Sequence, residues 1–236
     1  MRKYLYTTLL LALLAQEGVM AQENEGKTGG FFGKIKDTFS TEIKIGNYTF
    51  KDGSVYTGEM KGRKPNGKGK TVFKNGDVFE GDSFQCSIHG RAWSPSKREG
   101  YGIYMFPDGE KYEGQWFQDQ QHGKGIYYFM NNNRYDGMWY QDYQHGEGTM
   151  YYHNGDLYVG KWVNDKREGE GTYTWANGAK YTGHWKNDKK NGKGIMNWDD
   201  GCKYEGDWKD DVRHGKGVFE YTNGDKYDGD WADDIQ

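Results

Sequence analysis

Residues 135–157 read YDGMWYQDYQHGEGTMYYHNGDL, and they form one unit of a repeat. The unit opens with Tyr-x-Gly-x-Trp, continues with Gly-x-Gly and ends with Asn-Gly. The opening motif returns every 23 residues, at positions 112–116, 135–139, 158–162, 181–185, 204–208 and 227–231, after degenerate copies at 56–60 and 79–83. A fixed period of this size predicts an array of similar structural units, which more often displays a surface than performs chemistry.

The second half of each unit predicts a β-hairpin. Its Gly-x-Gly is followed by an Asn-Gly or Asp-Gly pair, and such a pair between two β-rich runs is the strongest short hairpin signal. Asn132 takes the place of glycine in one unit, and asparagine tolerates a left-handed backbone better than most residues. Large residues alternate with variable ones before each turn, as in a strand with one apolar and one wet face.

The register of the hairpins decides whether all aromatic residues share one face, because a one-residue slip inverts every side chain. A three-residue loop at 222–224 would set Tyr227 opposite Phe219. The same loop would set Gly229 opposite Gly217 and give Trp231 a glycine to lie across. We expect this register. Half-burial of each aromatic ring would then contribute roughly 2–3 kcal/mol, so the aromatic face can carry the fold.

Composition and charge narrow the function classes. Aromatic residues make up 17% of the chain, and Leu157 is the single leucine after residue 21, so an aliphatic core is not available. The net charge is −3 with both signs interspersed, which argues against nucleic acid and against strong attraction to anionic membranes.

The N-terminal segment predicts export. Residues 1–21 combine two basic residues, a short leucine-rich run and small residues before a cleavage point near Ala21, as in a signal peptide for a periplasmic or extracellular protein. A buried N-terminal helix is the alternative. Residues 22–42 are expected to form a mobile tail and a short amphipathic cap over the first hairpin, with membrane-surface contact as the alternative for the amphipathic part.

The array itself is expected over residues 43–236, with one insertion at 84–99. The insertion contains Cys86, His89 and Trp93. In a regular array, features specific to one protein are expected in such an insertion. A nucleophilic pair of Cys86 and His89 is the catalytic alternative, but one cysteine and one histidine in a loop do not by themselves indicate catalysis. Because about five units of roughly 10 Å separate Cys86 from Cys202, both thiols are expected to be unpaired within the monomer.

These motifs resemble the MORN repeat (membrane occupation and recognition nexus), here in an exported form. The match runs unit by unit from Tyr56 to Trp231. The resemblance implies an all-β fold, an elongated, twisted, single-layer antiparallel sheet of successive hairpins, often with an aromatic groove. It also implies scaffolding, dimerisation or protein binding, and a lipid-binding role was proposed for some members. The chain carries no attached kinase or methyltransferase domain.

Two recurring polar positions invite a metal hypothesis, which spacing disfavours. An aspartate follows each motif tryptophan by three residues, at positions 119, 142, 165, 188, 211 and 234, and is expected to accept backbone N–H bonds inside its own turn. Calcium requires six to eight oxygens within about 2.6 Å, whereas neighbouring copies stand about 10 Å apart. The same spacing separates His122, His145 and His214. We expect no metal, no cofactor and no catalytic residue.

The sequence therefore favours a non-catalytic exported scaffold that binds an extended protein or peptide, or self-associates as a homodimer, through its aromatic groove or sheet edge. A glycan-binding platform is the first alternative and peripheral lipid binding the second, while nucleic acid is excluded as a partner. The insertion adds His89 and Trp93 as candidate contacts. The expected groove residues are Tyr127, Phe129, Trp139, Tyr152, Trp162, Trp175, Trp185 and Trp198.

Overall fold

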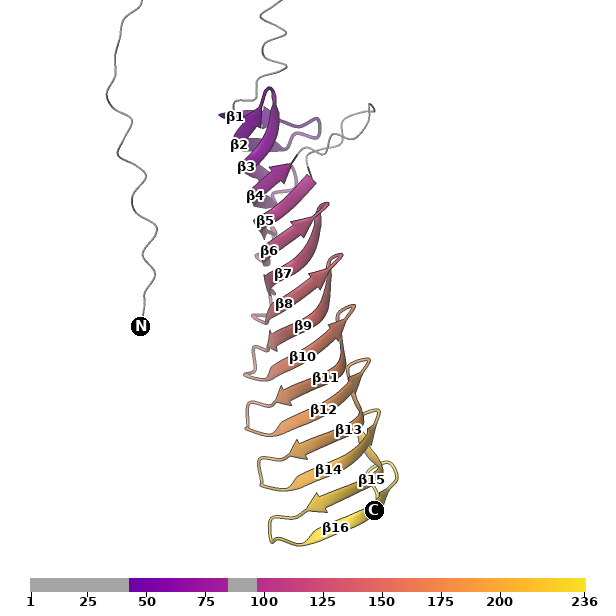
Figure 1. Ribbon diagram of the computed structural model, residues 1–236. Coiled ribbons are helices and arrows are strands. Elements are labelled where there is room, and N and C mark those ends of the chain that lie inside the picture. The colour runs from indigo at the N-terminus through magenta and orange to yellow at the C-terminus, as the bar shows by residue number, and fades with distance from the viewer. Residues whose placement is uncertain (1–42, 85–96) are drawn as a thin grey trace, which may run out of the picture.

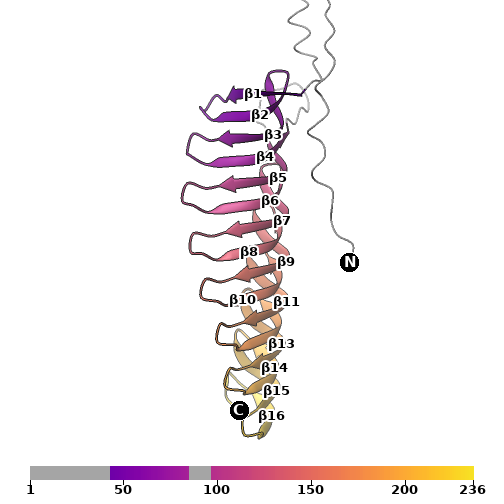
Figure 2. The ribbon, with the colours of Figure 1, turned by 90° about the vertical axis from the view of Figure 1, so that its left-hand side faces the viewer.

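The computed structural model describes residues 43–84 and 97–236 as one open sheet of antiparallel strands. Sixteen strands follow one another in sequence order, which is the predicted elongated array of hairpins (Figure 1). Figure 2 shows the strands stacked along the long axis, with a row of hairpin connections at one edge. The expectations for residues 1–21 and 22–42, for Cys86, His89 and Trp93, and for most of the insertion lie outside the described residues.

The strands are β1 (Ile43–Thr49), β2 (Val55–Lys61), β3 (Lys64–Val72), β4 (Val78–Phe84), β5 (Lys97–Met105), β6 (Lys111–Phe117), β7 (Gln120–Tyr128), β8 (Arg134–Tyr140), β9 (Tyr143–Tyr151), β10 (Leu157–Val163), β11 (Lys166–Thr174), β12 (Lys180–Lys186), β13 (Lys189–Asn197), β14 (Lys203–Lys209), β15 (Val212–Glu220) and β16 (Lys226–Trp231). Across the described residues, no helix has the length and apolar character needed to cross a membrane.

The predicted register is confirmed. In the last hairpin Phe219 pairs with Tyr227, Gly217 with Gly229 and Gly215 with Trp231. The 222–224 loop closes with Gly224 at φ 88°, the left-handed conformation expected of a bulge residue. Asn132 adopts φ 64° at the equivalent position, so asparagine does replace glycine there.

Every second strand pair, from β2–β3 to β14–β15, bends at a second glycine. In the β6–β7 pair the register shifts between Gly114 and Trp116, and Gly123 has φ 61°. A bulge of this kind bends the strand and increases its local twist. The same shift recurs between β8 and β9 and between β10 and β11. The bend is therefore built into every repeat and leaves the aromatic face concave.

The other end of each hairpin carries a two-residue turn that the Asn-Gly pattern does not predict. Gln118 and Asp119 both have positive φ, 51° and 73°, as a type I′ turn requires. The aspartates are therefore turn residues, but the expected hydrogen bond inside their own turn is wrong. The Asp119 carboxylate accepts the backbone N–H of Arg98 at 2.8 Å, in the preceding repeat. The backbone already closes the tight turn, so the carboxylate is free to link neighbouring hairpins.

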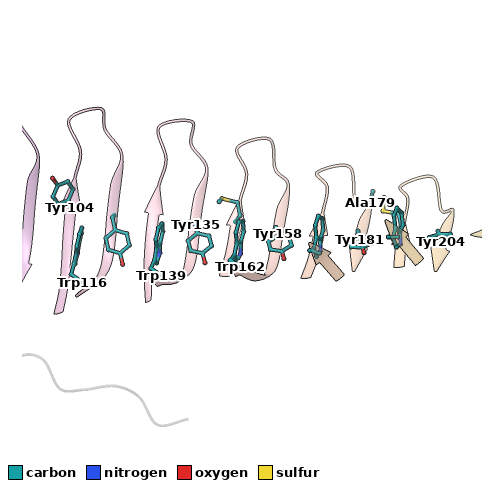
Figure 3. Close-up of a cluster of buried hydrophobic side chains, with 14 of the residues drawn as sticks. Tyr104, Trp116, Tyr135, Trp139, Tyr158, Trp162, Ala179, Tyr181 and Tyr204 are labelled. Atoms are coloured by element: carbon teal, nitrogen blue, oxygen red, sulfur yellow. The ribbon is translucent and has the colours of Figure 1, made fainter. Parts of the chain in front are cut away.

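A ladder of alternating tyrosine and tryptophan rings forms the core (Figure 3). Tyr135 is fully buried and meets Trp139 and Trp162 edge-on, with ring centroids 5.2 and 5.4 Å away. Its ring lies across Gly148, where a Cβ atom would come within 2.3 Å of the phenol oxygen. Edge-to-face pairs of this kind are favourable beyond the area that they bury.

Hydrogen bonds fix the ladder in place. The Trp139 indole N–H donates to the Gly125 carbonyl at 3.1 Å, and the Tyr135 hydroxyl donates to the Met138 carbonyl at 3.0 Å. Both bonds recur along the array, so each ring satisfies its polar atom while its apolar surface is buried. The motif is thus a packing device, and the core that it builds in the described residues contains no buried leucine, isoleucine or valine.

Candidate functional site: an aromatic groove

The concave face opens into a groove of about 790 Å³ between the two rows of hairpin connections. Hairpin loops with Asn131 and Asn133 form one rim, and the aspartate turns form the other. The groove extends from Arg98 to Asp188, past four aspartate turns. At two strand spacings per repeat, the three intervals between these turns amount to about 29 Å, enough for about nine residues of extended chain.

The structure brings five of the expected groove residues together and leaves three out. Trp175, Trp185 and Trp198 belong to the same aromatic face farther along the array, but they do not line this groove. The residues that line it as expected are Tyr127, Phe129, Trp139, Tyr152 and Trp162.

Burial separates the lining aromatics into two kinds. Trp139 and Trp162 are only 5% and 4% exposed, because they are members of the ladder. Tyr127, Phe129 and Tyr152 pack against the core and remain half-buried. A bound molecule would therefore contact mainly the half-buried rings near the loops.

Several tyrosine hydroxyls along this face are already engaged by carboxylates. The Tyr127 hydroxyl donates to Glu110, and the Tyr173 hydroxyl donates to Asp156 at 2.6 Å. Burial raises the pKa of Tyr127, and the adjacent Glu110 carboxylate raises it further. Tyr127 is thus a neutral, oriented ring at neutral pH rather than a base or a nucleophile.

Cations cover the tryptophans in the repeats that flank the groove. The Arg98 guanidinium lies 4.1 Å from the centre of the Trp116 ring, and its Nε is 3.3 Å from the Asp119 carboxylate. Arg167 repeats this arrangement, 4.3 Å from Trp185 and 3.2 Å from Asp188. Each such arginine joins a cation–π contact to an ion pair with the next aspartate turn.

This cation row was not recognised in the sequence, although its period is visible there. The position 21 residues before each turn aspartate carries the row. The role of this position is visible only in the structure, because the strand bend places its side chain over the next motif tryptophan. The members of the row are Arg98, Gln121, Gln144, Arg167, Lys190 and Arg213.

The histidines do not converge. His122 lies between Phe117 and Tyr140, with ring centroids 5.6 and 5.3 Å away, and His214 faces Asp233. Among residues 43–84 and 97–236, no group of three or more His, Cys, Asp or Glu side chains is placed to hold a metal. Cys202 is a free, partly buried thiol.

Fold and groove together define a β-hairpin repeat array with a concave aromatic surface. Seven segments match the MORN repeat, and the chain belongs to the MORN-repeat family, whose members generally act as non-catalytic scaffolds or interaction modules. The matched residues are 56–78, 93–111, 112–134, 135–157, 158–180, 181–203 and 204–226. No curated protein matches the chain significantly.

Solved structures with a similar course of strands are distant in sequence. The TCP domain of Drosophila melanogaster SAS-4, in complex with a proline-rich motif of Ana2, is 11% identical, with coverage of 90% of this chain and 99% of that chain and a TM-score of 0.41. The G-box domain of the microcephaly protein CPAP is 13% identical, with coverage of 80% and 100% and a TM-score of 0.38. Virginiamycin B lyase from Staphylococcus aureus has 11% identity, coverage of 82% and 70% and a TM-score of 0.18. Similarity at this level does not extend to function.

Proposed function

We propose that the chain is a non-catalytic interaction module that binds an extended protein segment along the aromatic groove. The observation that carries this proposal is the groove itself, which combines half-buried aromatic rings with polar groups on both rims. Spaced aromatic anchors beside satisfied polar groups are typical of protein-binding surfaces. The groove is open along its length, which suits a chain segment better than a compact ligand.

Self-association through a sheet edge is the less favoured form of this proposal. The outer edges of β1 and β16 have no strand partner in the 16-stranded sheet. On β16, however, the exposed side chains include Lys226, Asp228 and Asp230, and charged residues discourage edge-to-edge pairing. Light scattering of the purified chain at increasing concentration measures this competing mode directly.

The groove is tested by panning the immobilised full chain against a random dodecapeptide display library and, in parallel, by probing a glycan array. The substitutions Phe129→Ala and Tyr152→Ala remove half-buried rings from the groove. Tyr221→Ala is the matched control, because Tyr221 occupies the equivalent hairpin position outside the groove. Trp139→Ala is unsuitable, since it would also disrupt the ladder.

We expect the library to yield peptides whose binding falls with Phe129→Ala and Tyr152→Ala but not with Tyr221→Ala. Recovery of no groove-dependent peptide would contradict the proposal. Binding confined to glycans, and lost with the same two substitutions, would instead establish the glycan platform as the function.

Export is a separate part of the proposal and rests on residues 1–21 alone. The basic start, the leucine-rich run and the small residues before Gln22 are its support. N-terminal sequencing of the protein from its native host should begin near Gln22. An N-terminus at Met1 would contradict export through this segment.

A further inference from the structure

The groove lies where the cation row is interrupted. In four members of the row a basic side chain lies over a tryptophan: Arg98, Arg167, Lys190 and Arg213, at 4.1, 4.3, 4.0 and 4.2 Å from the ring centre. The two consecutive members between Arg98 and Arg167 are Gln121 and Gln144. The groove lining contains both glutamines and is bounded by the two arginines.

The interruption leaves two carboxylates without a cation. Asp142 accepts the backbone N–H of Gln121 at 2.7 Å, and Asp165 accepts that of Gln144 at 2.8 Å. Within the described part of the chain, neither carboxylate forms an ion pair. Both aspartates are exposed at the groove rim.

The two glutamines add a second, independent sign of an unfilled site. Gln121 is 7% exposed and Gln144 is 5% exposed, and both line the groove. Across residues 43–84 and 97–236, no hydrogen bond is made by either side-chain amide. The amide atoms themselves are not sealed from solvent, so both amides are available at the groove surface to hydrogen-bond a polar ligand.

The charge of the groove follows from these pairings. Its charged lining residues are Arg98, Arg167, Asp119, Asp142, Asp165 and Asp188. Arg98 is paired with Asp119 and Arg167 with Asp188. The two remaining negative charges, on Asp142 and Asp165, therefore have no cation beside them. They lie one repeat apart on the groove rim, halfway along the length of the groove.

We propose that the groove recognises a polyproline-II-like segment carrying two basic side chains three residues apart, which meet Asp142 and Asp165. The partner then supplies the cations that Arg98 and Arg167 supply in their own repeats. The side-chain carbonyl oxygens of the two glutamines accept hydrogen bonds from the same guanidinium or ammonium groups. This inference rests on the proposed function and specifies the chemistry of the bound segment.

The spacing of the two aspartates selects this backbone. Successive repeats are two strands apart, about 9.6 Å at the usual strand separation. A polyproline II helix has three residues per turn and rises about 3.1 Å per residue, so residues i and i+3 share one face about 9.3 Å apart. In a β-strand, residues three apart point to opposite faces, and only one could reach an aspartate.

The test uses calorimetric titration of the full chain with a blocked ten-residue peptide that is proline except for arginine at its fourth and seventh positions. A second peptide carries the arginines at its fourth and sixth positions, and a third carries citrulline at its fourth and seventh. We expect measurable binding of the first peptide, weakened by salt, and at least about tenfold weaker binding of the other two.

Two double variants place the contact in the groove. The first variant carries Gln121→Arg and Gln144→Arg, which complete the cation row and occupy the site with the chain's own arginines. The second variant carries Asp142→Asn and Asp165→Asn, which remove both negative charges but keep a side-chain oxygen that accepts the backbone N–H bond. Each is expected to weaken the first peptide about tenfold or more. Glu147→Gln removes one carboxylate charge at an exposed residue outside the groove lining and should leave binding unchanged. Circular dichroism in the aromatic region checks that the ladder is intact.

The inference is overturned if the first peptide does not bind, if the citrulline peptide binds equally well, or if the two double variants bind as the wild type does. The dodecapeptide library separates this result from failure of the proposed function. Groove-dependent peptides without paired basic residues would leave the interaction module standing and remove the dibasic partner. Absence of any groove-dependent peptide would remove both.

Discussion

The central repeats and the C-terminal repeats share one motif but finish their concave face differently. At the C-terminal end, Arg213 lies over Trp231 and its Nε is 2.8 Å from the Asp234 carboxylate. In the centre, Gln144 stands at the equivalent position and Asp165 has only a backbone N–H. One side chain per repeat thus decides whether the face is completed from within or left to a partner.

The contrast also separates stability from recognition. The Tyr–Trp ladder continues unchanged through both regions, with the Tyr158–Trp162 and Tyr204–Trp208 ring centroids each 5.2 Å apart. Because the ladder is uniform, binding specificity can vary at the cation row without loss of the fold. Arrays of this kind are stabilised mainly by contacts between neighbouring units, so local changes have local effects.

The largest expected effect is loss of a ladder tryptophan. Trp185→Ala removes a ring that is 5% exposed, its hydrogen bond to Gly171 and its contact with Arg167, and should lower the free energy of unfolding by about 3–5 kcal/mol. Trp162→Ala removes an equivalent ring without an arginine over it. Its loss should be smaller by roughly 0.5–1 kcal/mol, the cation–π contribution.

Urea unfolding followed by far-ultraviolet circular dichroism measures both variants. If Trp162→Ala destabilises the fold as much as Trp185→Ala or more, the arginine over Trp185 adds no stability, and the proposed difference between the two regions is contradicted. Hydrogen exchange would then identify which strands open in each variant, and we expect opening to be centred on the mutated repeat.

Conversion of a flanking repeat into a central one gives the next largest effect. Arg167→Gln removes the contact with Trp185, the ion pair with Asp188 and the 2.6 Å hydrogen bond to the Asp188 carbonyl. Because the pair is partly solvent-exposed, we expect a loss of about 1–2 kcal/mol. Lys166→Gln, an exposed neighbour on the same strand, is the control and should change stability little. An unchanged melting temperature in Arg167→Gln would show that the row does not stabilise the array.

The reverse change should stabilise the centre. Gln144→Arg provides a cation for Asp165 and Trp162 in the geometry of Arg167, and we expect a gain of about 0.5–1 kcal/mol. Differential scanning calorimetry should show a raised melting temperature. A lowered one would mean that the central groove cannot accept its own cation, and the two regions would then differ in backbone shape as well as in one side chain.

The ladder could be predicted from the sequence because it depends on local features, namely the type of each turn and the register that the turn sets. A turn of known type fixes the register, and the register places Tyr227 beside Phe219 and Trp231 across Gly215. The aspartate bridges could not be derived in this way. They join Asp119 to Arg98 across 21 residues, and that contact exists only because the strands bend at the bulge glycine.

The site was predictable only in part for the same reason. Tyr127, Phe129 and Tyr152 follow from strand alternation, so they could be placed on the groove face. The contrast between Gln144 and Arg167 is plain in the sequence, but without the bend nothing shows that this position faces a tryptophan and an aspartate. Regular repeats reveal which positions are equivalent, whereas the meaning of a departure from the repeat needs the tertiary contact.

The smallest expected effect is the acid sensitivity of the terminal pair. Burial acts to raise the pKa of Asp234, but hydrogen bonds from the Arg213 side chain and backbone outweigh it, and the pKa lies below its usual 3.8. A carboxyl group with a depressed folded-state pKa stabilises the fold above its unfolded-state pKa and loses that contribution as the pH falls through the folded-state value. The Asp234 side chain is 47% exposed, so solvent screening keeps the contribution small. Asp234→Asn should therefore melt slightly below the wild type at pH 6, and the difference should shrink as the pH is lowered through 4 toward 3. A difference in melting temperature that stays constant over this range would show that the terminal repeat is held by the hydrogen bonds of the turn rather than by its charge.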